Sequence, residues 1–146
     1  MMNQNLPDER LQRFVAILNK KIEIGKLMNA LAHMTAGLVG GYPDPKEMCF
    51  IEYPDKDGGM HPNISHFPFI VLKADNSNQI RTVRNEALNR GIAFTDFTST
   101  MTVGTSAEQV ERTKSTPEQE LDYWGICLFA DTNELREFTG KFSLFS

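Results

Sequence analysis

Apolar residues along the chain form short continuous runs separated by polar segments. Continuous apolar runs of this kind are typical of strands that are covered on both faces of a sheet. We expect four such main strands, at residues 14–18, 67–74, 92–97 and 124–129. A shorter apolar run at residues 48–52 predicts an edge strand or one arm of a hairpin.

Between these runs, apolar residues recur at helical spacing, starting near capping residues and stopping at glycines. The expected helices are residues 25–39 before Gly40 and Gly41, residues 77–90 before Gly91, the polar segment 106–114, and residues 132–138 with Thr132 as cap. The inner face of the second is Ile80, Val83, Ala87 and Leu88. Because strands and helices alternate, the sequence predicts an α/β fold with helices on both faces of one sheet.

Three segments fit neither pattern. Residues 1–9 are expected to be an extended arm, and residues 53–66, which are rich in Pro, Gly and Asp, a loop. The hydroxyl-rich residues 98–105 receive no assignment. The loop contains the metal-ligand types Asp55, Asp57, His61 and His66. Their spacing matches no established metal signature, so we expect a surface loop and no metal.

Length and composition narrow the class of protein. A chain of 146 residues predicts one domain, residues 1–146. There is no apolar run of about 18 residues for a membrane span, and the polar start shows no signal peptide, so we expect a cytoplasmic protein. Cys49 and Cys127 lie in apolar runs, which favours buried reduced thiols. A net charge of −4 disfavours general nucleic-acid affinity.

The helix at residues 25–39 has two different faces. Its core face is Leu27, Leu31, Met34 and Leu38, and a second face carries Lys26, Asn29, Ala30, His33 and Gly37. The small residues that flank His33 leave room above the imidazole for a ligand or for another packed element. The sequence leaves both interpretations open.

Three lysines gather around the start of this helix. Lys20, Lys21 and Lys26 would favour a phosphate there, because free N–H groups and the helix dipole already attract anions. The alternative is three solvated lysines. Lys26 and His33 are separated by about 10 Å along the helix axis, so one elongated ligand could contact both.

The strand at residues 92–97 carries a single acid, Asp96, near its carboxyl end. A buried unpaired carboxylate is costly, so Asp96 needs a partner or solvent. If this strand lay beside the first strand and parallel to it, Asp96 would face the helix start and could orient His33 or Lys26. The alternative is that Asp96 caps the following turn through Thr98 or Ser99.

The order of these segments, with GKLMNALAHM and IAFTDFTST, resembles peptidyl-tRNA hydrolase type II over residues 14–145. The chain is still more similar to an uncharacterised bacterial family of unknown function that shares that fold. Gly25, Lys26 and His33 match the glycine-lysine and histidine motif of the hydrolase. Asp96 and Thr100 match its aspartate and the threonine that follows.

The resemblance implies a three-layer α/β/α sandwich around a four-stranded mixed sheet, with an extra short strand or hairpin, in a homodimer. It implies that Lys26, His33, Asp96 and Thr100 are catalytic and hydrolyse the ester between peptide and tRNA. Asp96 would orient or deprotonate water, and Lys26 would stabilise the oxyanion or hold phosphate. The expected ligand-binding residues are Lys20, Lys21, Asn29 and Thr98.

The chain departs from the hydrolase pattern at several positions. Ala30 and Met101 replace glutamines, Thr98 replaces a glycine, and residues 106–122 look like an insertion. One alternative is therefore a module that binds a small anion or nucleotide without catalysis, and another is a structural homodimer without ligand. We expect tRNA or a small anion as partner, no cofactor, no membrane contact, and Trp124 in the core.

Overall fold

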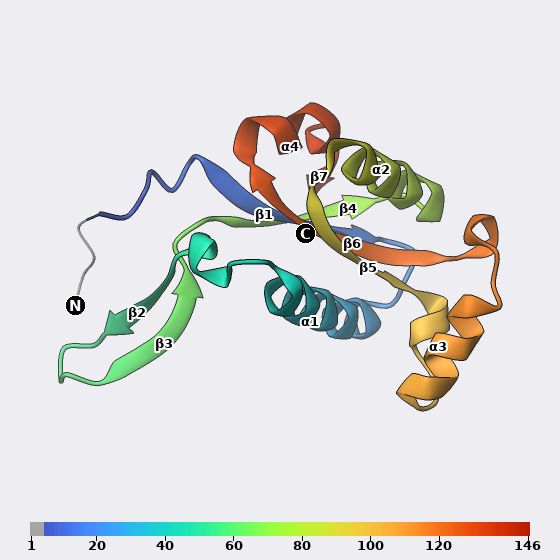
Figure 1. Cartoon of the computed structure of the whole chain (residues 1–146), viewed down its shortest axis with the longest axis horizontal. Helices are drawn as coiled ribbons and strands as arrows, with labels where there is room; N and C mark the ends of the chain where they lie inside the picture. The colour runs from blue at the N-terminus through green and yellow to red at the C-terminus, as the bar shows by residue number, and fades with distance from the viewer. Residues whose placement is uncertain (1–4) are drawn as a thin grey trace.

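The computed structural model describes residues 5–146 and centres on a five-stranded mixed sheet (Figure 1). The order across the sheet is β5 (Ala93–Thr98), β6 (Tyr123–Asp131), β1 (Gln12–Asn19), β4 (Phe69–Ala74) and β7 (Ser143–Leu144). β1 runs parallel to β4, and the other neighbouring pairs are antiparallel. The expected four-stranded sheet is corrected to five strands, because the chain end adds β7 beside β4. Residues 1–4 of the expected arm lie outside the described residues.

Helices cover both faces of this sheet, as the sequence predicts (Figure 1). On one face, Phe14, Ala16 and Leu18 of β1 pack with α1 (Ile24–Gly41). On the other face, Val15 and Ile17 pack in a second core with residues of α2 (Ser77–Arg90) and α4 (Thr132–Thr139). The continuous apolar run of β1 is explained by this double burial.

The helix ends follow local capping chemistry. The Asn76 side chain accepts a hydrogen bond from the Gln79 N–H and begins α2, and Gly91, with φ of 65°, ends it. The expected cap of α4 is corrected: the Asp131 carboxylate, not Thr132, accepts the N–H groups at its start. The expectation that Leu88 belongs to the inner face of α2 is also corrected, since its side chain is 52% exposed.

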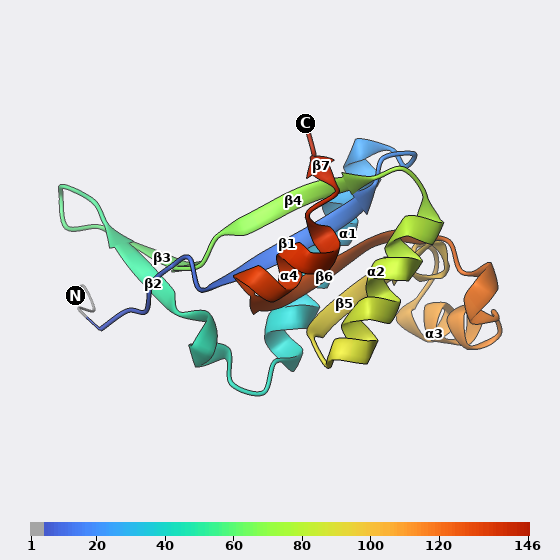
Figure 2. The ribbon, with the colours of Figure 1, turned by 90° about the horizontal axis from the view of Figure 1, so that it is seen from above.

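Residues 50–65 form a second, two-stranded sheet where a loop was expected over residues 53–66. β2 (Phe50–Pro54) pairs antiparallel with β3 (Met60–Ser65), and this hairpin projects from the body (Figure 2). The Asp55 carboxylate accepts the N–H groups of Asp57 and Gly59, which closes the turn. The short 3₁₀ helix η1 (Pro45–Met48) precedes the hairpin.

A small helical unit follows the end of β5. It consists of η2 (Ser99–Met101), α3 (Ser106–Lys114) and η3 (Glu118–Glu120). The start of α3 is fixed by a reciprocal capping box between Thr105 and Glu108. None of the described helices is long and apolar enough to cross a membrane.

The two cysteines are both free thiols, but their surroundings differ. Cys127 is fully buried in β6, as expected, and burial raises the pKa of its thiol to about 12. Cys49 is only half-buried and joins η1 to β2 with a φ of 53°, so the expectation of a buried thiol holds for Cys127 alone.

Candidate functional site

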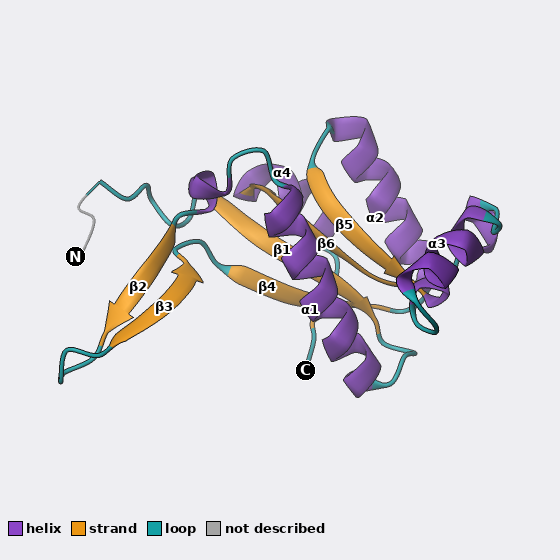
Figure 3. Cartoon of the chain, turned by 60° about the horizontal axis from the view of Figure 1, so that its bottom comes forward, coloured by secondary structure: helices purple, strands orange, loops and turns teal. Residues whose placement is uncertain are grey.

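A groove follows the first half of α1 beside the last residues of β5 and the first residues of β6. Figure 3 shows α1 lying across this face of the sheet. The groove consists of two adjoining hollows of about 410 and 390 Å³ that share Asn29, Phe97 and Thr102. We call it the α1 groove. Its lining includes Glu23, Gly25, Lys26, Val103 and Trp124 in the first hollow, and His33, Met34, Thr95, Met101 and Gln109 in the second.

Aromatic rings form a strip along the α1 groove. The Phe97 ring lies 5.8 Å from the Trp124 ring and 6.2 Å from the His33 ring, measured between centroids. The Lys26 ammonium lies 6.0 Å from the centre of the Trp124 ring. The groove therefore has a cation at one end, an imidazole at the other, and apolar rings between them.

A β-bulge aims Trp124 into the groove. Phe97 of β5 pairs with Gly125 of β6, but Thr98 pairs with Tyr123, so Trp124 is the extra residue. A bulge places two consecutive residues on one face of a strand. Gly125 shares that face without a side chain, because a Cβ there would lie 2.8 Å from the tip of Met34.

The start of α1 leaves donors available beside Lys26. Glu23 precedes the helix but makes no capping hydrogen bond, and the first turn contains no acidic residue. The first N–H groups of a helix lack internal partners and attract anions. Glu23 also lines the first hollow, so this end of the groove holds one carboxylate as well as one ammonium.

Comparison with known proteins places the fold in a family. A family model described as "Protein of unknown function (DUF2000)" matches residues 12–146. The chain belongs to the DUF2000 family. The structure of Atu0240, a protein of unknown function from Agrobacterium tumefaciens C58, is similar with a TM-score of 0.79 and 20% identity, over 92% of this chain and 98% of that one. That likeness shows a shared fold. No curated protein matches the sequence.

In this DUF2000 chain, the Asp96 carboxylate does not join Lys26 and His33. Asp96 borders the second hollow, but its side chain lies on the opposite face of β5 and accepts a hydrogen bond of 2.8 Å from Arg84 Nε on α2. Its neighbour Thr95 faces α1 and donates to the Met34 carbonyl. The condition for that meeting, a position of this strand beside β1, is not met, because β6 lies between β5 and β1. The predicted meeting of all three side chains is wrong.

The hydroxyls of Thr98 and Thr100 are buried in structural hydrogen bonds. Thr98 Oγ1 lies 2.6 Å from Thr100 Oγ1, which lies 2.8 Å from Thr113 Oγ1 on α3. Thr98 is completely buried and Thr100 is 8% exposed. Neither lines the α1 groove. This chain of hydroxyls ties β5 to α3, and the geometry gives the expected catalytic Thr100 and ligand-binding Thr98 no open face toward a substrate.

The three lysines also separate. Lys20 forms an ion pair of 2.8 Å with Asp75, whose pKa it holds below the usual range, and both side chains are exposed. Lys21 is exposed as well, and neither lysine lines the groove. Lys26 and Asn29 line the first hollow, and Asn29 and His33 the second. Four of the eight predicted site residues thus border the groove, namely Lys26, Asn29, His33 and Asp96, and the carboxylate of the last is held by Arg84.

The small residues near His33 admit a strand. Ala30 is fully buried, and a Cβ on Gly37 would lie 3.6 Å from the Thr95 methyl group of β5. The exposed His33 ring stands beside this contact, over Phe97. On this face of the helix, Gly37 thus accommodates a packed strand, whereas the space above His33 stays open for a ligand.

Sequence reasoning missed Trp124 and Glu23. Trp124 was expected in the core but is half-buried and lines the groove. The signal that could have identified it is the adjoining Gly125, because an isolated glycine in a strand often marks a bulge. Glu23 gave no signal beyond its place directly before a helix.

The acidic and histidine residues of the hairpin do not form a metal site. His61 Nε2 pairs with Asp55 at 2.9 Å, whereas His66 Nε2 donates to the Pro7 carbonyl at 2.7 Å. Within residues 5–146, no three His, Cys, Asp or Glu side chains gather closely enough to hold a metal ion.

Proposed function

We propose that this protein is a binding module for a small anionic ligand that carries a planar ring, such as a nucleotide. The observation that carries the proposal is the half-buried Trp124 ring beside Lys26, backed by the Phe97 ring, which is only 7% exposed. Planar rings stack on accessible aromatic faces such as that of Trp124, and anions bind at cations and at helix starts. The α1 groove offers both in one place.

The dimensions of the groove suit such a ligand. Lys26 and His33 lie about 10 Å apart along α1, which is the length of a small elongated molecule. An anionic group beside Lys26 would also meet the free N–H groups of the helix start, and a ring would lie over Trp124. Asn29 lines both hollows, and its side chain can donate or accept hydrogen bonds with the middle of such a ligand.

The structural hydrogen bonds of Asp96 and Thr100 favour binding over hydrolysis. The Asp96 carboxylate is held by Arg84, and the Thr100 hydroxyl is held by Thr98 and Thr113. A general base must reach the proton it removes, directly or through one water. The resemblance to peptidyl-tRNA hydrolase supports the alternative, an esterase, but its expected base lies on the other face of the sheet.

The test uses the single tryptophan of the chain, since Trp124 lies in the groove. We expect saturable changes in its fluorescence on titration with adenosine monophosphate or phenyl phosphate, and weaker ones with inorganic phosphate. Lys26→Met removes the cation and should weaken binding about tenfold. Lys21→Met is the matched control and should bind as the wild type does. The absence of any fluorescence change up to about 10 mM of all three probes would contradict the proposal.

A second assay addresses the esterase alternative. We expect no release of the N-acyl-amino acid from N-acyl-aminoacyl-tRNA beyond the spontaneous rate, even at high protein concentration. Turnover that is lost in Lys26→Met and retained in Lys21→Met would replace the binding module with a hydrolase.

A further inference from the structure

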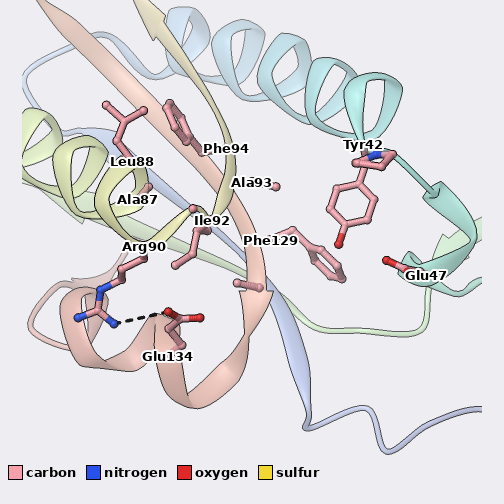
Figure 4. A pocket seen from close by; sticks show the side chains of 13 residues that line it. Tyr42, Glu47, Ala87, Leu88, Arg90, Ile92, Ala93, Phe94, Phe129 and Glu134 are labelled. Carbon is pink, nitrogen blue, oxygen red and sulfur yellow. Dashed lines mark ion pairs between the residues drawn. The ribbon is translucent and has the colours of Figure 1, made fainter.

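The carboxyl ends of α1 and α2 lie on either side of a hollow of about 600 Å³ beside the start of β5 (Figure 4). Tyr42, the residue that follows α1, lines one side. The other side is lined by the last turn of α2 and its cap, Ala87, Leu88, Arg90 and Gly91. We call this cavity the β5 hollow. It shares no lining residue with the α1 groove.

Most of the side chains that line the β5 hollow are apolar. Ile92 and Phe129 are 8% and 2% exposed and lie between its two sides. Leu88 is 52% exposed, and Tyr42 and Phe94 are half-buried, so apolar surface remains open to a ligand. Sites for small molecules are hollows of roughly 300–1,000 Å³ with mostly apolar walls and a few polar groups. The β5 hollow has this size and this composition.

The charged groups at the β5 hollow are mainly acidic. Among the described residues that line it, Arg90 is the one basic residue. Its guanidinium donates to Glu86 at 2.9 Å and to Glu137 at 2.7 Å, and lies 3.9 Å from Glu134. Three carboxylates therefore share one guanidinium, which leaves an excess of negative charge. Glu47 adds a carboxylate that forms no ion pair with any described residue.

The two helix ends add to this negative potential. The last carbonyl groups of a helix lack internal partners, and the macrodipole places about half a negative charge there. The last turn of α1 contains no basic residue to offset that charge, and the last turn of α2 contains only Arg90. The other end of α1, beside Lys26, has the opposite sign and borders the α1 groove. One helix thus favours anions at its start and cations at its end.

Tyr42 and Glu47 bring polar oxygens together beside the end of α1. Figure 4 shows the Tyr42 hydroxyl and the Glu47 carboxylate on the same side of the hollow. Burial raises the pKa of the Tyr42 phenol, and so do the charge of Glu47 and its hydrogen bond to the phenol. The phenol oxygen and the carboxylate can both accept hydrogen bonds from an ammonium group.

We propose that the β5 hollow binds a small organic cation, an amine attached to an apolar ring or chain. The ammonium group lies beside Glu47 and the end of α1, and the apolar part covers Leu88 and Phe94. A metal ion does not suit the hollow, because the described residues contain no cluster of three His, Cys, Asp or Glu side chains that could hold one. The site is independent of the ligand proposed for the α1 groove.

The test compares three probes of equal length at pH 7: 4-phenylbutylamine, which is protonated, the neutral 4-phenylbutanol and the anionic 4-phenylbutanoate. We expect the amine to bind with a dissociation constant of about 1 mM by calorimetry, the alcohol at least about fivefold more weakly, and the carboxylate not at all. Butylamine, which lacks the ring, should also bind at least about fivefold more weakly. In nuclear magnetic resonance spectra, the amide shifts caused by the amine should centre on residues 91–94.

Glu47→Gln tests the position of the ammonium group. The variant removes one exposed carboxylate, so it should weaken the amine about threefold to fivefold and leave the alcohol unchanged. Glu111→Gln is the matched control, since Glu111 is an exposed glutamate on α3, and it should bind the amine as the wild type does. Circular dichroism checks that both variants are folded.

Leu88→Arg tests the hollow itself. It places a guanidinium among the apolar lining residues and should abolish amine binding, whereas the neutral Leu88→Gln should keep most of it. Because Leu88 is 52% exposed, neither change opens the core. Lys26→Met should bind the amine as the wild type does, which separates this site from the α1 groove.

Four results would each overturn the proposal. They are no binding of 4-phenylbutylamine up to about 10 mM, equal affinity for the amine and the alcohol, amide shifts centred on the α1 groove, and equal weakening by Glu47→Gln and Glu111→Gln. Unchanged amine binding in Leu88→Arg would place the cation elsewhere on the molecule and would overturn it as well.

Discussion

The two faces of the sheet use their polar side chains differently, and β5 shows the difference most directly. Thr95 and Phe97 face α1 and border an open groove with Lys26, Asn29 and His33. Asp96, one position along, faces α2 and is held by Arg84. Along a strand, a shift of one residue moves a side chain to the opposite face. Asp96 therefore does not share a site with Lys26 and His33, although the residues on either side of it in the sequence border that groove.

The face of α2 uses its polar groups for structure. Tyr123 donates to Glu118 at 2.8 Å, and Arg81 pairs with the same carboxylate at 2.9 Å. Together with the pair of Arg84 and Asp96, these bonds join α2 to the strand ends and to η3. The α1 face has an unpaired ammonium, an amide and an imidazole beside a groove. Ligand binding is therefore expected on one face, and pH-dependent stability on both.

The largest expected effect is at alkaline pH. Burial, together with the hydrogen bond to Glu118, raises the pKa of Tyr123 from 10.0 to about 12. Because the folded pKa is the higher one, the neutral phenol stabilises the fold fully below about pH 10, and this contribution is lost as pH rises through 12. At about 1.4 kcal/mol per pKa unit, the loss is about 2–3 kcal/mol. Urea unfolding at several pH values should show this fall, and Tyr123→Phe should reduce it.

Cys127 provides the comparison on the α1 face. Its pKa is raised by burial from 9.0 to about 12, so its contribution declines from about pH 9 upward, by the same sign. We expect Cys127→Ala to remove the part of the alkaline fall that begins at the lower pH. An alkaline fall that neither variant alters would show that other groups control it.

A smaller effect is expected from Asp96→Asn. The substitution leaves the Arg84 guanidinium without its ionic partner, on side chains that are 27% and 16% exposed for Arg84 and Asp96. We expect a loss of about 1–2 kcal/mol in the free energy of unfolding, less than for a fully buried pair. The fluorescence titration with adenosine monophosphate should be unchanged. A variant that keeps its stability but loses ligand binding would place Asp96 in the site after all.

The smallest effect concerns the wall of the groove. Arg112 of α3 donates to the carbonyls of Thr100 and Val103 at 2.9 and 3.0 Å, which fixes the loop that supplies Thr102 and Val103. Arg112→Met should weaken ligand binding about threefold through the loosened loop, at a stability loss of about 1 kcal/mol. Lys114→Met, which removes a neighbouring charge with no such bond, is the control. Equal affinity in both variants would show that the loop needs no such support.

The sequence predicted most of the main-body elements, because their apolar periodicity is strong. It did not predict the hairpin of β2 and β3, although Met60, Pro62 and Ile64 alternate with polar residues within a segment dominated by Pro, Gly and Asp. Such alternation in the sequence favours a strand. It was outweighed by turn residues that occupy only residues 55–59.

The site was predicted in part for a different reason. The helical face with Lys26, Asn29 and His33 follows from local geometry alone, and the structure places these residues along one groove. The partner of Asp96 depends on which face of β5 each helix covers, and on β6 lying between β5 and β1. Both depend on the tertiary structure and cannot be predicted from a local sequence pattern. Trp124 likewise depends on a bulge in strand pairing.

The attachment of α3 has a consequence for local opening. This helix buries none of its side chains, and its hold on the body passes through the Thr98, Thr100 and Thr113 hydroxyls and the Arg112 guanidinium. Segments with so little buried apolar surface exchange their amide protons through sub-global fluctuations. Amides of α3 should therefore exchange with deuterium orders of magnitude faster than those of β1. Ligand in the groove should first slow exchange in the neighbouring residues 99–103, which connect β5 to α3.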